Sequence, residues 1–198
     1  MKPFLSYIGS KQKFMNKLEA LFPETINNYY EPFIGGGSVF FYLNDHDYDI
    51  KHNYINDLDS DVINNIYASI KNNSNKLIKY LYILTRKHSR KAFEELVDTF
   101  NCNKKDKVML AAIYIFFTKR TFNGWVRKND DGTIKSYYSN NHSFKKIYDY
   151  ENIMDIKDLL KTTTIQNKDY IKFLNQYNFK KDDFVFLDPP YLVEKVSE

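Results

Sequence analysis

The sequence predicts an α/β protein with an open sheet and a helical insertion. Short apolar stretches alternate with helical patterns in residues 1–74 and again in residues 147–198, which is typical of strands joined by helices. In the first of these parts, a glycine-rich loop connects an apolar stretch to a helix. Residues 75–121 have helical periodicity only, so we expect them to form an insertion outside the sheet.

The composition is that of a folded, soluble chain. Of the 198 residues, 43% are hydrophobic and 27% are charged, which excludes intrinsic disorder. Cys102 is the only cysteine, so an internal disulfide and a cysteine-rich zinc site are excluded. The sequence has no apolar run of membrane-spanning length and no signal-peptide core at its start. We therefore expect an intracellular protein, in the cytoplasm or on the nucleoid, without a membrane partner or a metal.

Positive charge is concentrated in one segment. Residues 104–146 hold ten Lys and Arg against three Asp, a balance of +7, whereas the whole chain carries +4. The remainder is therefore slightly acidic, at −3. Such a basic segment favours contact with a polyanion such as a nucleic acid, although a solvated surface would have the same composition.

The first elements are expected to be a turn and a helix. Gly9 marks the turn, and Phe14, Leu18 and Leu21 then recur at the spacing of one helical face. Pro23 ends this helix. Taken alone, the segment is expected to pack on the core as an N-terminal arm.

A strand, a glycine loop and a helix follow in residues 29–41. The loop consists of Gly35, Gly36 and Gly37, half of the six glycines in the chain. Glycines at this place permit a tight turn and let a ligand approach the backbone closely. The stretch lacks the dinucleotide-binding spacing and the lysine of a P-loop, so neither type of cofactor is favoured.

A second strand, residues 54–57, ends in an acid, Asp57. About twenty residues after a glycine loop, an acid is placed to accept hydrogen bonds from ribose hydroxyls. Many strand-to-helix turns carry an acid that only caps the helix, and Asp59 or Ser60 is expected to cap the helix here. The apolar residues of that helix are Val62, Ile63, Ile66, Tyr67 and Ile70. Loop and acid together predict a Rossmann-like nucleoside site.

The insertion begins with three helices, which are expected at residues 77–84, 92–100 and 108–117. A β-hairpin is expected at residues 122–138, because Asp131 and Gly132 form a turn signal between β-prone flanks. Trp125 and several cations on such a ribbon suit a DNA groove, where arginine pairs with guanine and a bulky ring wedges between bases. The alternative is a surface hairpin with Trp125 packed inward.

The last third returns to strands and helices. We expect a helix at residues 153–160, a strand at 162–166 and a helix at 169–177. In the last of these, the residues expected to face inward are Tyr170, Phe173 and Leu174.

The final strand leads into the tetrapeptide Asp-Pro-Pro-Tyr, residues 188–191. Residues 184–187 form an uncharged apolar run that predicts a buried strand, and the two prolines end it. A carboxylate, a rigid turn and an aromatic ring thus follow the strand, at the place where open α/β sheets bind ligands.

Two of these stretches, in this order, resemble the Dam-type, D12 class family of adenine-specific DNA methyltransferases. They are residues 31–40 (Glu-Pro-Phe-Ile-Gly-Gly-Gly-Ser-Val-Phe) and residues 188–191. Residues 4–11 are similar to the family's N-terminal cofactor motif, and residues 122–127 are similar to the start of its recognition hairpin. The resemblance extends over the whole chain and implies the Rossmann-like sheet of a class I S-adenosylmethionine-dependent methyltransferase.

The resemblance also implies roles for individual residues. S-adenosylmethionine would be bound by Tyr7, Gly9, Lys11, Phe33, Gly35, Gly37, Asp57, Asp169, Tyr170 and Asp188. In this set the glycine loop would lie along the methionine part of the cofactor, and Asp57 would hold its ribose. Asp169 and Tyr170 would contact its adenine. The catalytic residues would be Asp188, Pro189, Pro190 and Tyr191.

Double-stranded DNA is the implied partner, and an adenine flipped out of the duplex is the implied substrate. Candidate DNA contacts are Lys119, Arg120, Asn123, Trp125, Arg127, Lys128 and Lys135. Arg127 stands where the family reads a guanine, whereas Trp125 stands where the family usually has a smaller aliphatic residue.

The implied chemistry agrees with the residues of the tetrapeptide. Asp188 and the Pro189 carbonyl would accept the two amino hydrogens of adenine, which localises the nitrogen lone pair toward the methyl group. Tyr191 would stack on the base. Positioning and electrostatics then suffice, without a covalent intermediate or a metal.

The expected domains are a catalytic domain, residues 1–74 and 147–198, and a helical plus β-hairpin target-recognition insertion, residues 75–146. The family continues beyond the tetrapeptide, so we expect a C-terminally incomplete sheet with residues 183–188 at an edge. We then expect either a second polypeptide that completes the sheet or weak activity of the chain alone. The alternatives are an inactive DNA-binding remnant and methylation of RNA or protein glutamine. The glutamine enzymes generally begin the tetrapeptide with Asn, which disfavours them.

Overall fold

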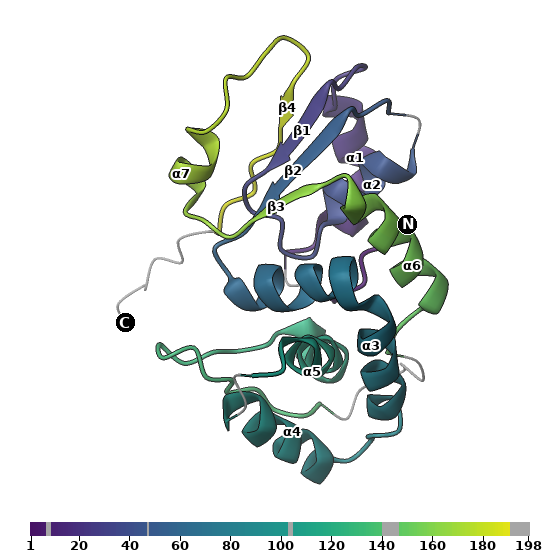
Figure 1. Ribbon diagram of the computed structural model, residues 1–198, viewed down its shortest axis with the longest axis vertical. Helices are drawn as coiled ribbons and strands as arrows, with labels where there is room; N and C mark the ends of the chain where they lie inside the picture. Colours follow the sequence, from purple (N-terminus) through teal and green to yellow (C-terminus); the bar gives the residue numbers. More distant parts are fainter. Residues whose placement is uncertain (7–8, 47, 103–104, 140–146, 191–198) are drawn as a thin grey trace.

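The computed structural model describes residues 1–6, 9–46, 48–102, 105–139 and 147–190 of an α/β protein. Its strands are β1 (Asn28–Glu31), β2 (His52–Asn56), β3 (Thr164–Gln166) and β4 (Phe184–Val185). These four strands form one sheet in the order β3-β2-β1-β4, and all their pairings are parallel (Figure 1). The predicted α/β class with a Rossmann-like parallel sheet is therefore confirmed.

Helices cover the sheet and build the rest of the described chain. The α-helices are α1 (Met15–Leu18), α2 (Ser38–Asp45), α3 (Ala68–Leu84), α4 (Arg90–Cys102), α5 (Lys107–Arg120), α6 (Tyr150–Lys161) and α7 (Tyr170–Leu174). Shorter turns are the 3-10 helices η1 (Lys11–Phe14), η2 (Glu19–Leu21) and η4 (Phe122–Gly124), and the π-helical η3 (Asp61–Tyr67). Each strand of the sheet except the last is thus followed by a helix, as parallel pairing requires.

Neighbouring rings on β1 point to opposite faces of the sheet, because side chains alternate along a strand. The Tyr29 ring stacks on Phe40 of α2, with 6.4 Å between ring centroids. The Tyr30 ring lies 4.7 Å from Tyr54 and 5.0 Å from Tyr177, which follows α7. Both faces of the sheet are therefore covered by aromatic packing, with α2 on one side and the α7 segment on the other.

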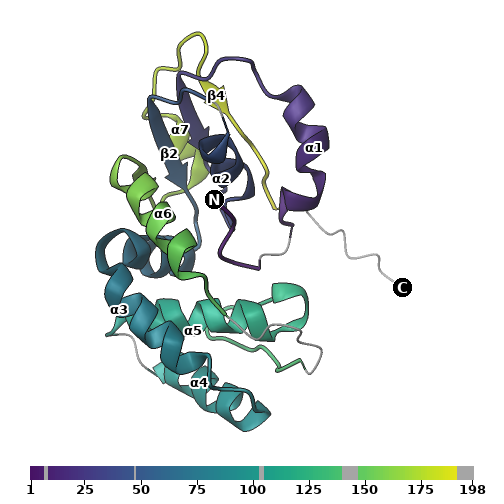
Figure 2. The same cartoon turned by 90° about the vertical axis from the view of Figure 1, so that its right-hand side faces the viewer.

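The insertion forms a layer of helices beside the sheet. Figures 1 and 2 show α3 between the sheet and α5, with α4 beyond α5. Residues 110–118 of α5 are all buried, because α3 and η3 pack on it from one side and α4 from the other. No helix in the described ranges is long and apolar enough to cross a membrane.

The predicted helices at residues 77–84, 92–100, 108–117 and 153–160 are confirmed as parts of α3, α4, α5 and α6. The predicted domain boundary, between residues 74 and 75, falls inside α3, which continues through it. Asn73, just before that boundary, has non-helical backbone angles (φ −139°, ψ 30°). The division into two domains stays a prediction.

The predicted apolar face of residues 14–21 is wrong. Phe14 is 57% exposed and Leu21 is 79% exposed, whereas Met15 is buried at 5%. The segment consists of η1, α1 and η2 in succession, and 3-10 turns have three residues per turn. The spacing of 3.6 residues therefore does not hold along it.

The last two elements differ in detail from the prediction. The helix expected at residues 169–177 is the five-residue α7, where Phe173 is buried but Tyr170 is 43% exposed and not inward. The expected buried strand is the short β4, which is half-buried, and Leu187 beyond it is 54% exposed. β4 pairs with β1 alone in the described chain, so its expected position at an edge is confirmed.

The predicted hairpin is only partly formed. Its first residues fold as η4, and pairing is limited to a bridge between Lys128 and Ile134 with flanking backbone hydrogen bonds. Gly132 forms the tip with φ of 80°, as the turn signal predicts. We call residues 121–139 the recognition segment below.

Candidate active site

The carboxyl ends of the strands meet at one edge of the sheet, where the strand order reverses between β1 and β4. Open parallel sheets bind ligands at such a switch point. A cavity of about 470 Å³ lies there, within the usual size of a small-molecule site. We call it the sheet-edge cavity. Of the predicted residues, those lining it are Gly9, Lys11, Phe33, Gly35, Gly37, Asp57, Asp188, Pro189 and Pro190.

The glycine loop forms one wall of the sheet-edge cavity. Gly37 has φ of 72°, and a Cβ there would lie 2.6 Å from the Tyr67 hydroxyl and 2.7 Å from the Phe41 ring. Helix α2 starts at the next residue, and no side chain of the described residues caps it at Gly37. The first N–H groups of a helix are unpaired within the helix, so this wall favours an anionic group of a ligand.

Asp57 holds the glycine loop in place. Its Oδ2 accepts a hydrogen bond from the Gly35 N–H at 2.8 Å, and its Oδ1 accepts one from the Asp59 N–H at 2.9 Å. Burial raises the pKa of Asp57, and these two N–H bonds oppose the rise. A carboxylate has about four lone-pair sites, so the turn-forming role and the ribose role are compatible.

Asn56, which the sequence prediction missed, joins three loops at this edge. Its side chain is fully buried, donates to the Pro32 and Lys168 carbonyls at 3.0 and 2.9 Å, and accepts from the Lys168 N–H at 2.9 Å. The signal in the sequence that could have indicated Asn56 is its position directly before Asp57, the acid at the end of the predicted strand. Asn56 therefore sets the distance between the ends of β1, β2 and β3.

Glu31 is a second residue of the cavity that the prediction missed. It is 3% exposed, and the Tyr29 hydroxyl donates to its carboxylate at 2.8 Å. Burial raises the pKa of Glu31 well above its usual value; the Tyr29 bond opposes this, and the charges of Asp188 and Asp57 add to it. Glu31 therefore tends to hold a proton, and the charged groups that line the cavity are Asp57, Asp188 and Lys11. Two carboxylates against one ammonium still favour a cation.

Lys11 reaches the tetrapeptide at the far side of the cavity. Its Nζ lies 2.5 Å from Asp188 Oδ2 and 3.2 Å from the Gly9 carbonyl oxygen. Both side chains of the pair are about one quarter exposed or less, at 21% and 24%. A predicted cofactor residue and the predicted catalytic carboxylate are therefore in direct contact. The predicted residues Tyr7 and Tyr191 lie outside the described residues.

Asp169 and Tyr170 lie at the rim and do not line the cavity. The Asp169 carboxylate accepts from the Ile171 and Lys172 N–H groups at 2.9 and 3.4 Å and so caps α7. The Tyr170 ring lies 5.3 Å from the ring of Phe33, which does line the cavity. These two rings form one aromatic surface at the rim, on which a planar group could stack.

A groove of about 1230 Å³ runs from the N-terminal segment to the recognition segment. Among its described lining residues, the cations are Lys13, Lys119 and Arg127, and none is acidic. Gly9 and Ser10 line both this groove and the sheet-edge cavity. A positively charged groove therefore opens next to a negatively charged cavity.

The predicted DNA contacts separate into different environments. Those lining the groove are Lys119, Asn123, Trp125 and Arg127. Lys135 is exposed but lies outside the groove. The prediction for Arg120 is wrong, because its side chain is 1% exposed and its guanidinium carbon lies 5.6 Å over the Phe116 ring. Periodicity could not reveal this, since Arg120 ends a helix buried on all sides.

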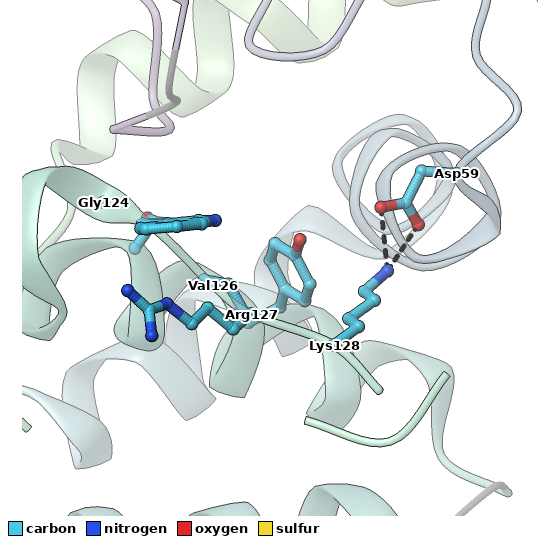
Figure 3. Close-up of a pocket in the computed structure, with 8 residues that line it drawn as sticks. Asp59, Gly124, Val126, Arg127 and Lys128 are labelled. Atoms are coloured by element: carbon cyan, nitrogen blue, oxygen red, sulfur yellow. Dashed lines mark hydrogen bonds and ion pairs between the residues drawn. The ribbon is translucent and has the colours of Figure 1, made fainter. Parts of the chain in front are cut away.

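The Arg127 and Lys128 side chains diverge from the recognition segment, and both line one pocket (Figure 3). The Arg127 guanidinium stacks on the indole of Trp125, 3.9 Å from the ring centroid. Trp125 is 48% exposed, so the alternative of an inward-packed tryptophan is wrong. The Lys128 ammonium instead lies between Asp59 and Asp61.

Gly124 is a further residue that the prediction missed. Its φ is 74°, and a Cβ there would lie 2.1 Å from the Ser6 carbonyl oxygen. Lys119 Nζ also donates to the Ser6 hydroxyl at 3.1 Å. The recognition segment is therefore packed directly on the chain that leads to Gly9 and Lys11.

Comparison with known proteins relates this geometry to a family. Residues 7–197 match the family model described as D12 class N6 adenine-specific DNA methyltransferase. Similar curated proteins include the type II methyltransferase M.MjaIII of Methanocaldococcus jannaschii, 33% identical over 205 residues, and M1.LlaDCHI of Lactococcus lactis subsp. cremoris, 31% identical over 197 residues. The type II methyltransferase M.CviBI of Paramecium bursaria Chlorella virus NC1A is 26% identical over 193 residues.

These alignments cover nearly all of the chain but not all of the relatives. They include 96%, 97% and 96% of this chain, and 69%, 66% and 69% of the three relatives in the same order. The chain therefore spans about two thirds of the length of the curated relatives it matches.

Proposed function

Because the chain belongs to the D12 class N6 adenine-specific DNA methyltransferase family, we propose that it methylates the exocyclic amino group of a flipped adenine in duplex DNA, with S-adenosylmethionine as donor. One observation carries the proposal. An acidic cavity and a cationic groove meet at Gly9 and Ser10, so a cationic cofactor and a polyanionic substrate have adjoining sites.

The described residues of the sheet-edge cavity fit the proposed donor. Its sulfonium and ammonium groups carry positive charge, which Asp57 and Asp188 complement. Its carboxylate suits the start of α2, where Gly37 leaves no room for a Cβ. Asp57 would hold the ribose, and the rings of Phe33 and Tyr170 would flank the adenine. When bound, the donor supplies an electrophilic methyl group.

Asp188 is proposed to activate the substrate. The lone pair of an adenine amino group is delocalised into the ring, so the nitrogen is a poor nucleophile. Asp188 and the Pro189 carbonyl would accept its two hydrogens and localise the lone pair on nitrogen. As the carbon–nitrogen bond forms, the bond between the methyl group and sulfur would break, and the donor would leave as a neutral thioether. The amino nitrogen would lose one proton, which Asp188 would accept. Pro190 would keep the turn rigid, and Tyr191 is proposed to stack on the base.

Duplex DNA is proposed to lie along the cationic groove. Asn123, Trp125 and Arg127 would face the bases, while Lys13, Lys119 and Lys135 would balance phosphates. Extruding the target base costs roughly a few kcal/mol, which stacking inside a pocket offsets. The shared wall at Gly9 and Ser10 is where the extruded base would pass from groove to cavity.

The variant Asp188→Ala tests this proposal. Methyl transfer to adenine-containing duplex DNA should fall at least about a thousandfold, because the charged acceptor for the amino hydrogen is removed. S-adenosylmethionine affinity, measured by calorimetry, should change only a few-fold. Transfer that survives the change contradicts the assigned role of Asp188.

Calorimetry of the unaltered chain also addresses the alternative of an inactive DNA-binding remnant. Such a remnant would bind duplex DNA and give no heat with S-adenosylmethionine. The proposed enzyme gives saturable heat with the cofactor and binds DNA as well.

A further inference from the structure

Lys128 forms an ion-pair node between the recognition segment and the turn that follows β2. Its Nζ lies 2.7 and 2.8 Å from the two carboxylate oxygens of Asp59, and 2.8 Å from Asp61 Oδ2. Figure 3 marks the two Asp59 contacts. The three side chains are between 21% and 25% exposed. The pairs are therefore better shielded from water and salt than ordinary surface ion pairs.

The node continues toward the sheet-edge cavity through hydrogen bonds. The Asp59 N–H donates to Asp57 Oδ1 at 2.9 Å, and Asp57 Oδ2 accepts from the Gly35 N–H at 2.8 Å. Asp59 Oδ1 also accepts from the Asp61 N–H at 2.9 Å, so the acid that holds Lys128 shapes the same turn. A shift of Lys128 therefore acts, through Asp59, on the carboxylate proposed to hold the ribose.

The same node fixes the direction of the neighbouring side chain. Successive side chains of an extended segment point to opposite sides, and the cross-strand bridge to Ile134 keeps the backbone extended at Lys128. With Lys128 held against Asp59, Arg127 diverges from it, lines the groove and stacks on Trp125.

The ion pairs disfavour a direct phosphate contact for Lys128. A phosphate near its ammonium would also approach the carboxylates of Asp59 and Asp61, which repel it. Burial lowers the pKa of Lys128, but the charges and hydrogen bonds of Asp59 and Asp61 outweigh burial and raise it. The lysine thus stays charged and engaged in the node.

We propose that Lys128 is a positioning residue that couples the two ligand sites: its ion pairs with Asp59 and Asp61 hold the DNA-facing segment against the turn that binds the cofactor. The inference rests on the proposed function, since it needs a cofactor in the cavity and DNA in the groove. Coupling of this kind is reciprocal, so each ligand tightens the binding of the other.

The test compares the affinity of one duplex in the presence and absence of a cofactor-site ligand. Fluorescence anisotropy gives the Kd of a mixed-sequence, adenine-containing duplex with and without saturating S-adenosylhomocysteine, at several salt concentrations. The variants are Lys128→Met, Lys128→Arg and Asp59→Asn, which keeps the oxygen that accepts from the Asp61 N–H. Lys91→Met is the matched control, because Lys91 is an exposed cation of the insertion on α4, outside the groove and the node.

The expected result is a loss of coupling without a loss of either site. S-adenosylhomocysteine should tighten duplex binding about fivefold or more in the unaltered chain and in Lys91→Met. The ratio of the duplex Kd without S-adenosylhomocysteine to the Kd with it should approach one in Lys128→Met and in Asp59→Asn. Lys128→Arg should keep most of the tightening. Asp59→Asn is the most informative, since removing an acid should otherwise only favour DNA binding.

Three results overturn the inference and are distinguishable. An unchanged ratio in folded Lys128→Met and Asp59→Asn removes the coupling role and leaves the proposed function standing. Equal weakening of DNA binding with and without S-adenosylhomocysteine, with a salt slope lower by about one, identifies a phosphate contact instead. If the unaltered chain binds neither ligand, the proposed function fails first. Should Lys128→Met not fold, as judged by circular dichroism, Asp59→Asn and Lys128→Arg carry the same comparison.

Discussion

The sheet-edge cavity and the groove differ in how the chain builds them. The cavity is formed by the glycine loop and by side chains at or just after the ends of parallel strands. The groove is formed by side chains from segments far apart in the sequence, residues 3–13 and 118–139. A residue's role in the cavity therefore follows from its place after a strand, whereas its role in the groove depends on its tertiary neighbours.

The cations in the recognition segment and just before it illustrate the difference. Arg120, Arg127 and Lys128 have the same charge and lie within nine positions of one another, yet one is buried, one stacks on an indole and one is held by two carboxylates. The acids of the cavity, by contrast, all line the same space. Charge in a segment predicts the class of partner but not which side chain meets it.

The largest effect is expected where the two regions touch. In Gly124→Ala, the new Cβ would lie 2.1 Å from the Ser6 backbone oxygen, which cannot move away as a side chain could. Unfolding in urea should show a loss of about 3 kcal/mol or more, and duplex affinity should fall with it. Gly132→Ala is the control, because Gly132 also has positive φ but no heavy atom within 4 Å. It should cost only about 1–2 kcal/mol, the strain of a left-handed backbone. Equal losses in the two variants would contradict the close packing at Ser6.

A second substitution acts on the cavity alone. In Gly37→Ala, the Cβ would meet the Tyr67 hydroxyl and the Phe41 ring at 2.6 and 2.7 Å, and both are side chains that can shift. We expect a loss of about 2–3 kcal/mol and a weaker affinity for S-adenosylmethionine by calorimetry. Duplex affinity in the absence of cofactor should stay close to that of the unaltered chain. If Gly37→Ala lost duplex affinity and kept its affinity for S-adenosylmethionine, the assignment of Gly37 to the cavity alone would be contradicted.

The acidic character of the cavity predicts a pH dependence. The folded-state pKa of Glu31 lies well above its usual value of 4.5, so the folded chain retains a proton there that the unfolded chain releases. As pH rises from 4.5 toward the folded pKa, this group lowers the free energy of unfolding by up to about 1.4 kcal/mol per pH unit. Glu31→Gln removes that slope and keeps an oxygen for the Tyr29 hydroxyl. The free energy of unfolding of this variant, relative to that of the unaltered chain, should therefore rise with pH. Urea unfolding from acid to neutral pH measures this, and parallel stability curves would contradict it.

The smallest effect is expected at the rim of the groove. In Trp125→Leu, Arg127 loses a half-exposed ring partner, a contact typically worth about 0.5–1 kcal/mol. Duplex affinity should fall about two- to fivefold, while cofactor affinity without DNA stays unchanged. Anisotropy and calorimetry on the same preparation check both values. An unaltered duplex affinity would mean that the stacked arrangement does not prepare Arg127 for DNA.

The parts of the fold and site that the sequence predicted are those set by neighbours along the chain. The glycine loop, Asp57 and Asp188 each come within a few residues of the end of a strand, and parallel pairing then brings them to one edge. The helices of the insertion were predicted for a similar reason, since 3.6-residue periodicity is a local property. The face of residues 14–21 was not predicted correctly, because 3-10 turns break that periodicity.

The residues that were missed act across long sequence separations. Asn56 joins loops up to 112 positions away, and Gly124 meets Ser6. Lys128 was predicted as a DNA contact, but its pairing with an acid 69 positions earlier was missed. Glu31 was part of a recognised motif, but only its burial beside Asp57 and Asp188 gives it an electrostatic role. No pattern of spacing in one sequence contains such pairings.

The most direct test of the proposed function is the chemical identity of the methylated base. Under single-turnover conditions, with the chain in excess over a mixed-sequence duplex, methyl transfer from labelled S-adenosylmethionine is followed by nucleoside digestion and mass spectrometry. We predict labelled N6-methyladenine with the unaltered chain and none above background with Asp188→Ala. Label on cytosine, or N6-methyladenine at equal levels with both chains, would contradict the assignment.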